Sequence, residues 1–299
     1  MSPSPFFLLG PTAVGKSDLA ADLAEHFHGE IVGADALQIY RGLDLLTAKP
    51  NAETLARVPH HLIGEIPATE TCDAANYANM ASVRIGEIAT RGHCPFVVGG
   101  TGFYIRALTH GLPEMPAANE ALRSELAAQP LVDLVERLAT LDPESAGAID
   151  RRNPRRVIRA LEVCLLTGRP FSSFRDGRAH PRITLQGAIL ERDRTDLANR
   201  IDTRTEAMFA AGVVEEVRAS GPISATAEQV IGLREIRDLL ASKITREECI
   251  RLIQVRTRQY AKRQATWFAR DTHFTRLNLT RLTPTQSLRQ LRALLSAQA

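Results

Sequence analysis

The sequence GPTAVGKS at residues 10–17 matches the phosphate-binding loop pattern G-x-x-x-x-G-K-[S/T] in full. The apolar run FFLL at residues 6–9 has the length of a buried strand, and residues 17–25 have the composition of a helix. A loop at such a strand-to-helix turn directs backbone N–H groups toward a phosphate at the helix N-terminus. Lys16 is expected to reach phosphate oxygens, and Ser17 to ligate Mg²⁺. The sequence therefore predicts a diphosphate or triphosphate site formed by Gly10, Pro11, Thr12, Ala13, Val14, Gly15, Lys16 and Ser17.

The length and composition of the chain allow a sizeable hydrophobic core. Its 299 residues are 44% hydrophobic, enough for one large domain or two smaller ones. No apolar stretch approaches the ~20 residues of a membrane span, and FFLLG is too short for the core of a signal peptide. Four cysteines lie far apart without metal-ligand spacing, as is typical of reduced thiols: Cys72, Cys94, Cys164 and Cys249. We therefore expect a cytoplasmic protein with no membrane partner.

Strand and helix patterns alternate over the first hundred residues, which predicts a parallel α/β sheet. Strand candidates follow at residues 30–34 and 95–98, with a helix over 74–91 between them. Polar residues come directly after both strands: Asp35 after the first of them, and GGTG, which contains Thr101, after the other. Because ligands of open α/β sheets bind at the carboxyl ends of the strands, we expect Asp35 and Thr101 to lie close to the phosphate loop.

From about residue 113 to residue 180 the pattern changes to helices only, at 119–128, 131–141 and 154–167. A strand-like segment at 183–190 resumes the α/β pattern, and everything after it is expected to be helical.

These patterns define the expected domains. We predict an α/β fold with a P-loop NTPase-like parallel-sheet core, at residues 1–114 and 183–299. An all-helical domain is inserted into this core at residues 115–182.

Asp35 is the candidate for acid–base chemistry. A carboxylate directly after a buried strand could act as a general base or hold Mg²⁺ through water. A turn aspartate that caps the next segment is the alternative interpretation. The GGTG segment permits close backbone approach to a ligand, with the Thr101 hydroxyl as a donor, but it could equally be a tight strand–helix turn.

The run RRNPRRVIR at residues 151–159 predicts a helix with Asn153 as N-cap and Pro154 as its first residue. Its arginines fall on one face: Arg152, Arg155, Arg156 and Arg159. Cations in a first helical turn oppose the helix dipole, at a cost of roughly 0.3–1 kcal/mol each. The arrangement therefore favours binding of polyanion phosphates over a merely solvated face.

Two further features are basic. A long amphipathic helix over residues 245–271 interleaves basic residues with Tyr260, Trp267 and Phe268, which suits nucleic-acid contact. A core helix with a basic outer stripe is the alternative. In ANRIDTR at residues 198–204, Arg204 falls roughly 60° from the apolar stripe of its helix. An arginine so placed is half-buried and needs an anion, from an aspartate or from a ligand phosphate.

In this combination and order, the segments resemble the tRNA dimethylallyltransferase family, also called tRNA isopentenyltransferases. The matching segments are GPTAVGKS (10–17), ADALQIYRGLDLLTAKP (34–50), PHHL (59–62), VVGGTGFY (97–104), NPRRVIRALEV (153–163), RIDTR (200–204), VIGLRE (230–235) and TRQYAKRQATWFAR (257–270). They cover nearly the whole chain, and the set is far more specific than any of its members.

The resemblance implies transfer of a dimethylallyl group from dimethylallyl diphosphate to the exocyclic amine of the adenosine immediately 3′ of the anticodon in tRNA, with release of diphosphate. It implies that Asp35 is the general base, and that Thr101 and Arg204 help to hold the diphosphate. The tRNA anticodon stem-loop is the implied partner. The positions that match the family's tRNA contacts are Asp35, Ala36, Leu37, Gln38, Thr101, Arg123, Arg155, Arg156, Val157, Ile158, Arg159, Gln229, Val230, Ile231, Gly232, Leu233 and Arg234. No heptad seam or exposed apolar repeat argues for a dimer, so we expect a monomer.

The chain departs from the family pattern at three positions. Ala36 stands where the family commonly has Ser, Leu46 where it has Gly, and Leu233 where it has Tyr. None of these changes removes a charged group, so we expect activity to be retained with an altered rate or tRNA preference. Two other functions stay open as alternatives: a small-molecule kinase that uses ATP on the same loop, and an RNA-binding ATPase that modifies nothing.

Overall fold

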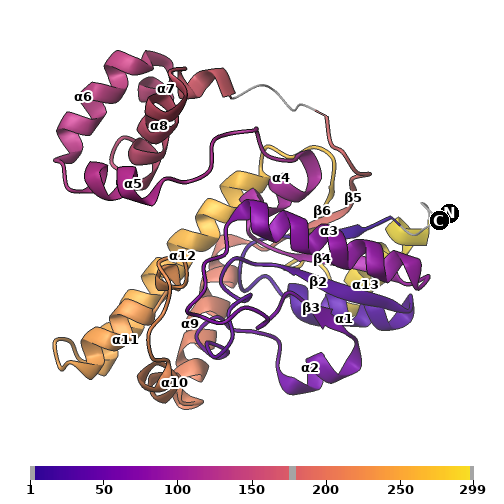
Figure 1. The fold of residues 1–299 in the computed structure, drawn as a ribbon. Coiled ribbons are helices and arrows are strands. Elements are labelled where there is room, and N and C mark those ends of the chain that lie inside the picture. The colour runs from indigo at the N-terminus through magenta and orange to yellow at the C-terminus, as the bar shows by residue number, and fades with distance from the viewer. Residues whose placement is uncertain (1–3, 175–179, 297–299) are drawn as a thin grey trace. The chain divides into compact units, whose positions relative to one another are not determined.

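The computed structural model describes residues 4–174 and 180–296. The chain divides into two compact units (Figure 1): unit 1 comprises Met1–His110 and Pro181–Ala299, and unit 2 comprises Gly111–His180. The boundaries expected from sequence, at 115 and 182, lie within a few residues of these. Residues 1–3, 175–179 and 297–299 of the expected domains lie outside the described residues.

Unit 1 is built on a sheet of six parallel strands in the order β3-β2-β4-β1-β5-β6. The strands are β1 (Phe6–Leu9), β2 (Gly29–Ala34), β3 (His60–His61), β4 (Cys94–Gly99), β5 (Gln186–Glu191) and β6 (Thr275–Asn278). In the register of β1, Leu9 lies opposite Gly99 on one side and Ile189 on the other. Because all strands run in one direction, the phosphate loop, Asp35 and Thr101 follow strands that end at the same edge of the sheet. The predicted α/β fold is confirmed.

The expectation that the chain is helical after residue 190 is wrong at β6, which pairs in parallel with β5. Leu277 is its only buried residue, and the buried Phe274 precedes it. A four-residue edge strand with one buried side chain offers too short an alternation to be recognised from sequence. The two-residue strand β3 was missed for the same reason.

Alternating side chains give the sheet two apolar faces. Phe6 and Leu8 of β1 belong to a core that includes residues of α1 (Lys16–His26) and α13 (Pro284–Ser296). The intervening Phe7 and Leu9 are equally buried. Helix α3 (Ala74–Thr90) packs on β2 and β4, and α4 (Gly102–His110) packs on α3 (Figure 1). The central strand is thus covered on both faces, as an all-parallel sheet requires.

The other helices of unit 1 are α2 (Ala52–Arg57), α9 (Arg194–Ala210), α10 (Val213–Ala219), α11 (Leu233–Leu240) and α12 (Arg246–Phe268), with a short 3₁₀ turn η2 (Ala227–Gln229). Helix α12 is the long helix expected at residues 245–271, and Thr245 caps it by accepting a hydrogen bond from the Glu248 N–H. It packs against α9, α11 and α4. Within residues 4–174 and 180–296, no helix has the length and apolar character needed to cross a membrane.

The described part of unit 2 is helical throughout its regular structure: α5 (Glu120–Ala127), α6 (Leu131–Leu141), α7 (Pro143–Ala148), α8 (Pro154–Thr167) and a 3₁₀ turn η1 (Phe171–Phe174). Its core includes Leu126, Leu134, Leu138 and Leu161. Asn153 and Pro154 begin α8 as predicted, because the Asn153 side chain accepts a hydrogen bond from the Arg156 N–H. Helix α7 was not predicted.

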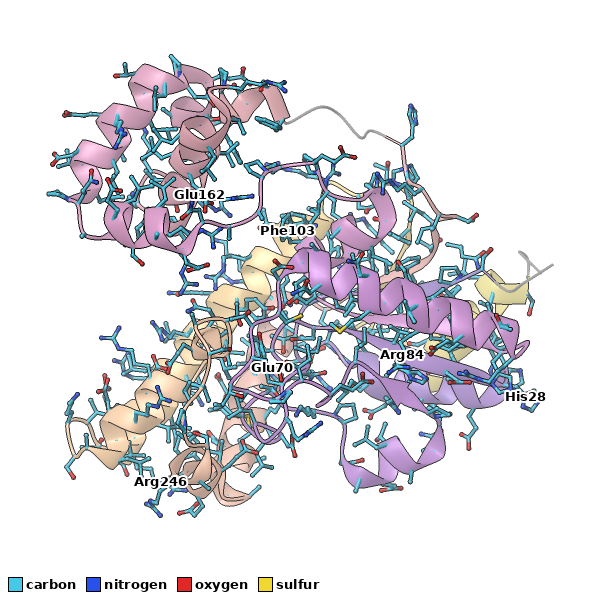
Figure 2. The ribbon with its side chains drawn as sticks, in the orientation of Figure 1. His28, Glu70, Arg84, Phe103, Glu162 and Arg246 are labelled. Carbon is cyan, nitrogen blue, oxygen red and sulfur yellow. The ribbon has the colours of Figure 1, made fainter. Side chains whose placement is uncertain are left out.

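A buried carboxylate connects the helices of unit 2. The Glu162 side chain on α8 (Figure 2) is fully buried, and it accepts hydrogen bonds from Arg123 of α5 (2.9 Å), Arg159 (2.5 Å) and the Asn119 N–H (2.7 Å). Burial alone raises the pKa of Glu162, but the Arg159, Asn119 and Arg123 donors outweigh burial and hold it below its ordinary value. Glu162 therefore stays ionised and ties α5 to α8.

Replacing Glu162→Ala should destabilise unit 2 by about 3 kcal/mol, because it leaves two partly buried arginines without their shared anion. Hydrogen-exchange mass spectrometry of α5 and α8 reports this locally. The matched control is Glu125→Ala, an exposed position on α5, which should change protection by less than about 0.5 kcal/mol. Equal protection in the two variants would contradict the role of Glu162.

Candidate active site

The phosphate loop between β1 and α1 has a backbone that requires glycine. Gly10 (φ 148°) and Gly15 (φ 104°) both take positive φ values. A Cβ atom at Gly10 would lie 2.4 Å from the Leu190 carbonyl oxygen on the neighbouring strand β5. Ala13 also has a positive φ of 64°, which is unfavourable for a residue with a side chain. The loop is therefore strained and needs partners that hold it.

Side chains from distant elements supply those partners. The Arg204 Nη2 atom donates to the Thr12 hydroxyl (2.9 Å), and the Arg200 Nε atom donates to the Ala13 carbonyl (2.9 Å). Arg192 Nε donates to the Val14 carbonyl (2.8 Å). The loop also donates a hydrogen bond itself, from the Thr12 N–H to Gln264 Oε1 of α12 (2.8 Å). These contacts fix the loop and add three positive charges around it.

Lys16 lies inside the loop. Its Nζ atom donates to the carbonyl oxygens of Gly10 (2.9 Å) and Pro11 (2.8 Å). Burial lowers the pKa of Lys16 to about 8; Asp35 opposes that shift, and Arg204 adds to it. Burial also lowers the pKa of Arg204, again opposed by Asp35. Two desolvated cations thus lie near one carboxylate, and an anionic ligand would stabilise both.

Asp35 and Thr101 are held together at the ends of β2 and β4. Asp35 Oδ1 accepts hydrogen bonds from the N–H groups of Leu37 (2.9 Å) and Gln38 (3.4 Å). The Thr101 hydroxyl accepts from the Ala36 N–H (3.0 Å), and the Thr101 N–H donates to the Ala34 carbonyl (3.2 Å). Among the described residues, Asp35 Oδ2 has no hydrogen-bond partner. The turn therefore orients the carboxylate through one oxygen and leaves the other for a ligand.

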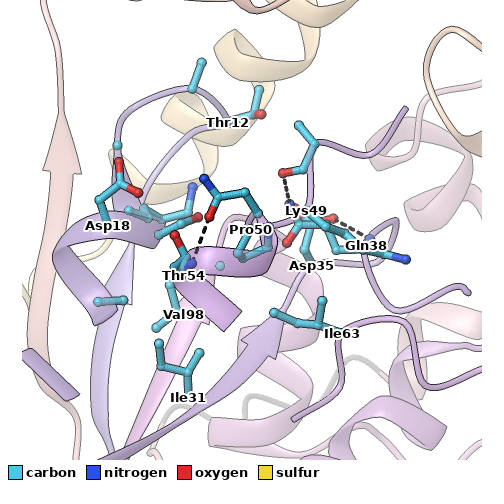
Figure 3. A pocket seen from close by; sticks show the side chains of 18 of the residues that line it. Thr12, Asp18, Ile31, Asp35, Gln38, Lys49, Pro50, Thr54, Ile63 and Val98 are labelled. Carbon is cyan, nitrogen blue, oxygen red and sulfur yellow. Dashed lines mark hydrogen bonds between the residues drawn. The ribbon is translucent and has the colours of Figure 1, made fainter. Parts of the chain in front are cut away.

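A cavity of about 540 Å³ opens in front of the loop (Figure 3). The predicted residues that line it are Thr12, Ala13, Gly15, Lys16, Ser17, Asp35, Gln38 and Arg204. Pro11 and Val14 are buried and do not line it. Gly10 donates its N–H to the Gly99 carbonyl (3.3 Å), and the Thr101 hydroxyl accepts the Ala36 N–H. A second cavity of about 40 Å³ shares Thr12, Asp35 and Arg204 with the first.

The positions that match tRNA contacts fall into several environments. In unit 1, Gln229 and Arg234 are exposed, Ile231 lines the small cavity, and Val230, Gly232 and Leu233 are buried.

In unit 2, Arg155 and Arg156 are exposed and form no ion pair with a described residue. Arg123 and Arg159 instead bind Glu162, as described above. The Val157 side chain lies in the core of the unit, and Ile158 is half-buried.

The buried residues of α12 agree with the core-helix interpretation, and the nucleic-acid interpretation stays a prediction. Cys249, Ile253, Thr257, Ala261 and Phe268 form a buried stripe, as in a core helix. Three basic residues pair with acids: Arg251 with Glu248, Arg256 with Glu235 and Arg258 with Asp202. Lys262, Arg263 and Arg270 form no ion pair within the described chain, and Trp267 is 46% exposed. These residues leave a basic, aromatic surface at the C-terminal end of the helix.

The sequence analysis did not predict the three side chains that form hydrogen bonds with the loop backbone, namely Gln264, Arg200 and Arg192. Gln264 continues the buried stripe of α12, eleven residues after Ile253, and a polar residue on an apolar stripe signals a specific partner. Arg200 lies one helical turn before Arg204, so the same face of α9 carries both. Arg192 follows β5 directly and offered no comparable signal.

The chain is similar to known proteins over most of its length. Residues 38–271 match the family model described as IPP transferase. The chain is 45% identical over 268 residues to tRNA dimethylallyltransferase 1 of Citrifermentans bemidjiense, which covers 88% of each protein. The tRNA dimethylallyltransferase of Geobacter metallireducens is 45% identical over 274 residues, again 88% of each.

Solved structures give the same result. The full-length tRNA isopentenylpyrophosphate transferase of Bacillus halodurans matches with a TM-score of 0.73 at 34% identity, over 98% of this chain and 96% of that one. A eukaryotic dimethylallyltransferase acting on tRNA matches with a TM-score of 0.81 at 26% identity, over 97% of this chain and 77% of that one. Because the family model spans most of its residues and relatives are 45% identical over 88% of its length, this chain belongs to the IPP transferase family.

Proposed function

We propose that this protein transfers a dimethylallyl group from dimethylallyl diphosphate to the exocyclic amine of the adenosine 3′-adjacent to a tRNA anticodon. One observation carries the proposal: Lys16, Arg204 and Asp35 line one cavity. The cations suit a diphosphate leaving group, and the carboxylate suits a proton from the acceptor. The names of the relatives, tRNA dimethylallyltransferase, supply the two substrates.

Departure of the diphosphate is the step that the loop assists. The bond between the first allyl carbon and the diphosphate oxygen breaks, and a bond forms between that carbon and the adenine nitrogen. Negative charge grows on the departing oxygen, where Lys16, Arg204 and loop N–H groups stabilise it. The Arg204 Nε atom is buried and has no partner among the described residues, so it can donate to the diphosphate.

The residues at the start of α1 fit Mg²⁺. The Ser17 hydroxyl is a hard oxygen donor that lines the large cavity together with the Asp18 and Asp35 carboxylates. Mg²⁺ takes phosphate oxygens and waters for most of its coordination, so one or two protein oxygens suffice. When bound there, the ion would add positive charge against the leaving diphosphate.

Removal of the amine proton is assigned to Asp35. The exocyclic amine of adenine is a weak nucleophile and must lose a proton as it attacks the allyl carbon. Asp35 is oriented through Oδ1 and can take this proton on Oδ2, from which it passes to solvent. Thr101 positions the turn by accepting the Ala36 N–H.

Binding of tRNA requires that the target base leave its stack, at a cost of a few kcal/mol. Phosphate contacts offset this cost. The candidates are the exposed cations that form no ion pair with a described residue: Arg155 and Arg156 of α8, Lys262 of α12, and Arg270, which follows the end of α12. Cys72, Cys94, Cys164 and Cys249 are free thiols, which supports a reducing, cytoplasmic location for such an enzyme.

The decisive experiment follows the label. Purified protein, bulk tRNA and Mg²⁺ are incubated with dimethylallyl diphosphate labelled in its carbon chain, or with ATP labelled at the γ-phosphate. We expect label from the allyl donor in tRNA, and none from ATP. Phosphorylation of a small molecule would favour a kinase, and ATP hydrolysis without tRNA modification would favour a non-modifying ATPase.

Replacing Asp35→Asn should lower the transfer rate by at least ~100-fold, within the range of general-base catalysis, with little change in tRNA affinity. The asparagine carbonyl can still accept the Leu37 N–H, so the turn is kept and only the base is lost. Asp22→Asn, on the exposed surface of α1 beside Arg57, is the control and should transfer normally. A normal rate in Asp35→Asn would assign this residue a structural role.

Binding of inorganic diphosphate should weaken as the pH rises above 8. The pKa of Lys16 lies at about 8 because the ammonium is buried, so the cation is fully present below that pH and is lost above it. The dissociation constant measured by calorimetry should then rise by up to about tenfold per pH unit. Ionisation of diphosphate affects every variant equally, so Lys16→Arg, which keeps its charge, should show a flatter profile. Parallel profiles would contradict the assignment.

A further inference from the structure

Two exposed aromatic side chains lie where the end of α12 meets the start of α4. Trp267 is 46% exposed and Phe103 is 52% exposed (Figure 2). A Cβ atom on Gly102, the first residue of α4, would lie between 2.1 and 2.5 Å from the Cδ1, Nε1 and Cγ atoms of Trp267. The indole therefore packs directly on the backbone of Gly102, with nearly half of its surface still open to solvent.

The surface around these rings carries cations and no acids. Arg263 lies one helical turn before Trp267 on α12, and Arg106 lies three residues after Phe103 on α4; both are exposed. Neither forms an ion pair in the part of the chain that the structure describes. The Arg263 guanidinium lies over the Tyr260 ring, 5.7 Å from its centroid. Neither α4 nor the part of α12 after its first turn contains an acid. This charge favours a negatively charged partner.

This surface adjoins the active site. Gln264, three residues before Trp267 on α12, accepts a hydrogen bond from the Thr12 N–H of the phosphate loop (2.8 Å). Three residues of helix rise about 4.5 Å. On the other element, Thr101 directly precedes Gly102. A polynucleotide that reaches the reacting groups therefore brings its neighbouring nucleotides close to the two aromatic rings.

Exposed aromatic rings beside cations suit unpaired nucleobases. Every base has a π-face that stacks on an aromatic ring, and arginines bind the phosphates between bases. In a double helix the bases already stack on one another, so a duplex offers this surface its phosphates and sugars only. A second copy of the chain suits the surface less, because it would bring the same cations together. The chemistry therefore favours a single-stranded loop of RNA.

We propose that Trp267, supported by Gly102 and flanked by Phe103, stacks on an unpaired base of the tRNA anticodon loop next to the target adenosine. Arg263 and Arg106 bind the adjoining phosphates. The inference rests on the proposed function and adds to it a site for a second nucleotide. Because stacking does not depend on a hydrogen-bond pattern, this site holds the loop in place without selecting the base.

Trp267 is the only tryptophan of the chain, so tryptophan fluorescence reports on this site directly. The test titrates the full chain with an RNA hairpin that has the anticodon stem and loop of a tRNA with adenosine 3′-adjacent to its anticodon. Filter binding measures the dissociation constant independently. We expect the hairpin to quench the Trp267 emission with that same dissociation constant. A fully paired RNA duplex of equal length should bind at low salt without comparable quenching.

Variants separate stacking from charge. Trp267→Leu keeps an apolar side chain but removes the ring, and should weaken hairpin binding by roughly 10-fold or more, whereas Trp267→Phe keeps a π-face and should retain most of the affinity. Gly102→Ala should also weaken binding, since its Cβ atom displaces the indole. Arg263→Gln should instead lower the slope of log Kd against log salt concentration by about one. Leu55→Ala, at an exposed apolar position on α2, is the matched control and should change neither quantity.

Hairpin binding without quenching would overturn the inference and leave the proposed function standing, as would an unchanged affinity in Trp267→Leu and Gly102→Ala. A change of the Trp267 emission with protein concentration alone would overturn it in favour of contact with a second copy of the chain. Failure of the wild type to bind the hairpin would overturn the inference together with the tRNA substrate of the proposed function.

Discussion

The hydrogen bonds between distant side chains and the phosphate-loop backbone are the constraint on which the rest of unit 1 depends. The loop contains a positive φ at Ala13 as well as at its glycines, and so cannot rely on local preference alone. Arg200 and Arg192 bind the carbonyls of Ala13 and Val14, and Gln264 binds the Thr12 N–H across 252 residues of sequence. Helices α9 and α12 therefore stabilise the loop through these hydrogen bonds. The first seventeen residues specify its conformation but do not stabilise it alone.

The electrostatics of the loop make sense only with an anion present. Lys16 is buried and donates hydrogen bonds to two carbonyls. Among the described residues, the buried Arg204 Nε atom has no partner, and Asp35 is the carboxylate that opposes the lowered pKa of both cations. Without a ligand this arrangement is unfavourable for folding, and a large apolar core on both faces of the sheet has to outweigh it. A diphosphate relieves that penalty, and the relief contributes to its binding.

The sequence predicted correctly those features that depend only on residues close together in the chain. The glycine pattern of the loop, the N-cap of α8 and the polar residues after β2 and β4 each need only neighbours in the chain, and all lie where they were expected. Edge strand β6 could not be recognised because pairing with β5, and not its own pattern, creates it. Gln264 is similar: nothing within α12 indicates that its partner is Thr12.

The arginines show the same limit on a larger scale. Along α8 the spacing places Arg155 and Arg159 on one face, but Glu162 three residues further on is fully buried and binds only the second. From the sequence, both are expected to be surface cations. In the structure Arg155 is exposed, whereas Arg159 is half-buried and pairs with the buried Glu162. A basic helix predicts contact with a polyanion only through the arginines that have no acid to bind, and burial of the acid, which depends on the packing of α5 against α8, decides which these are.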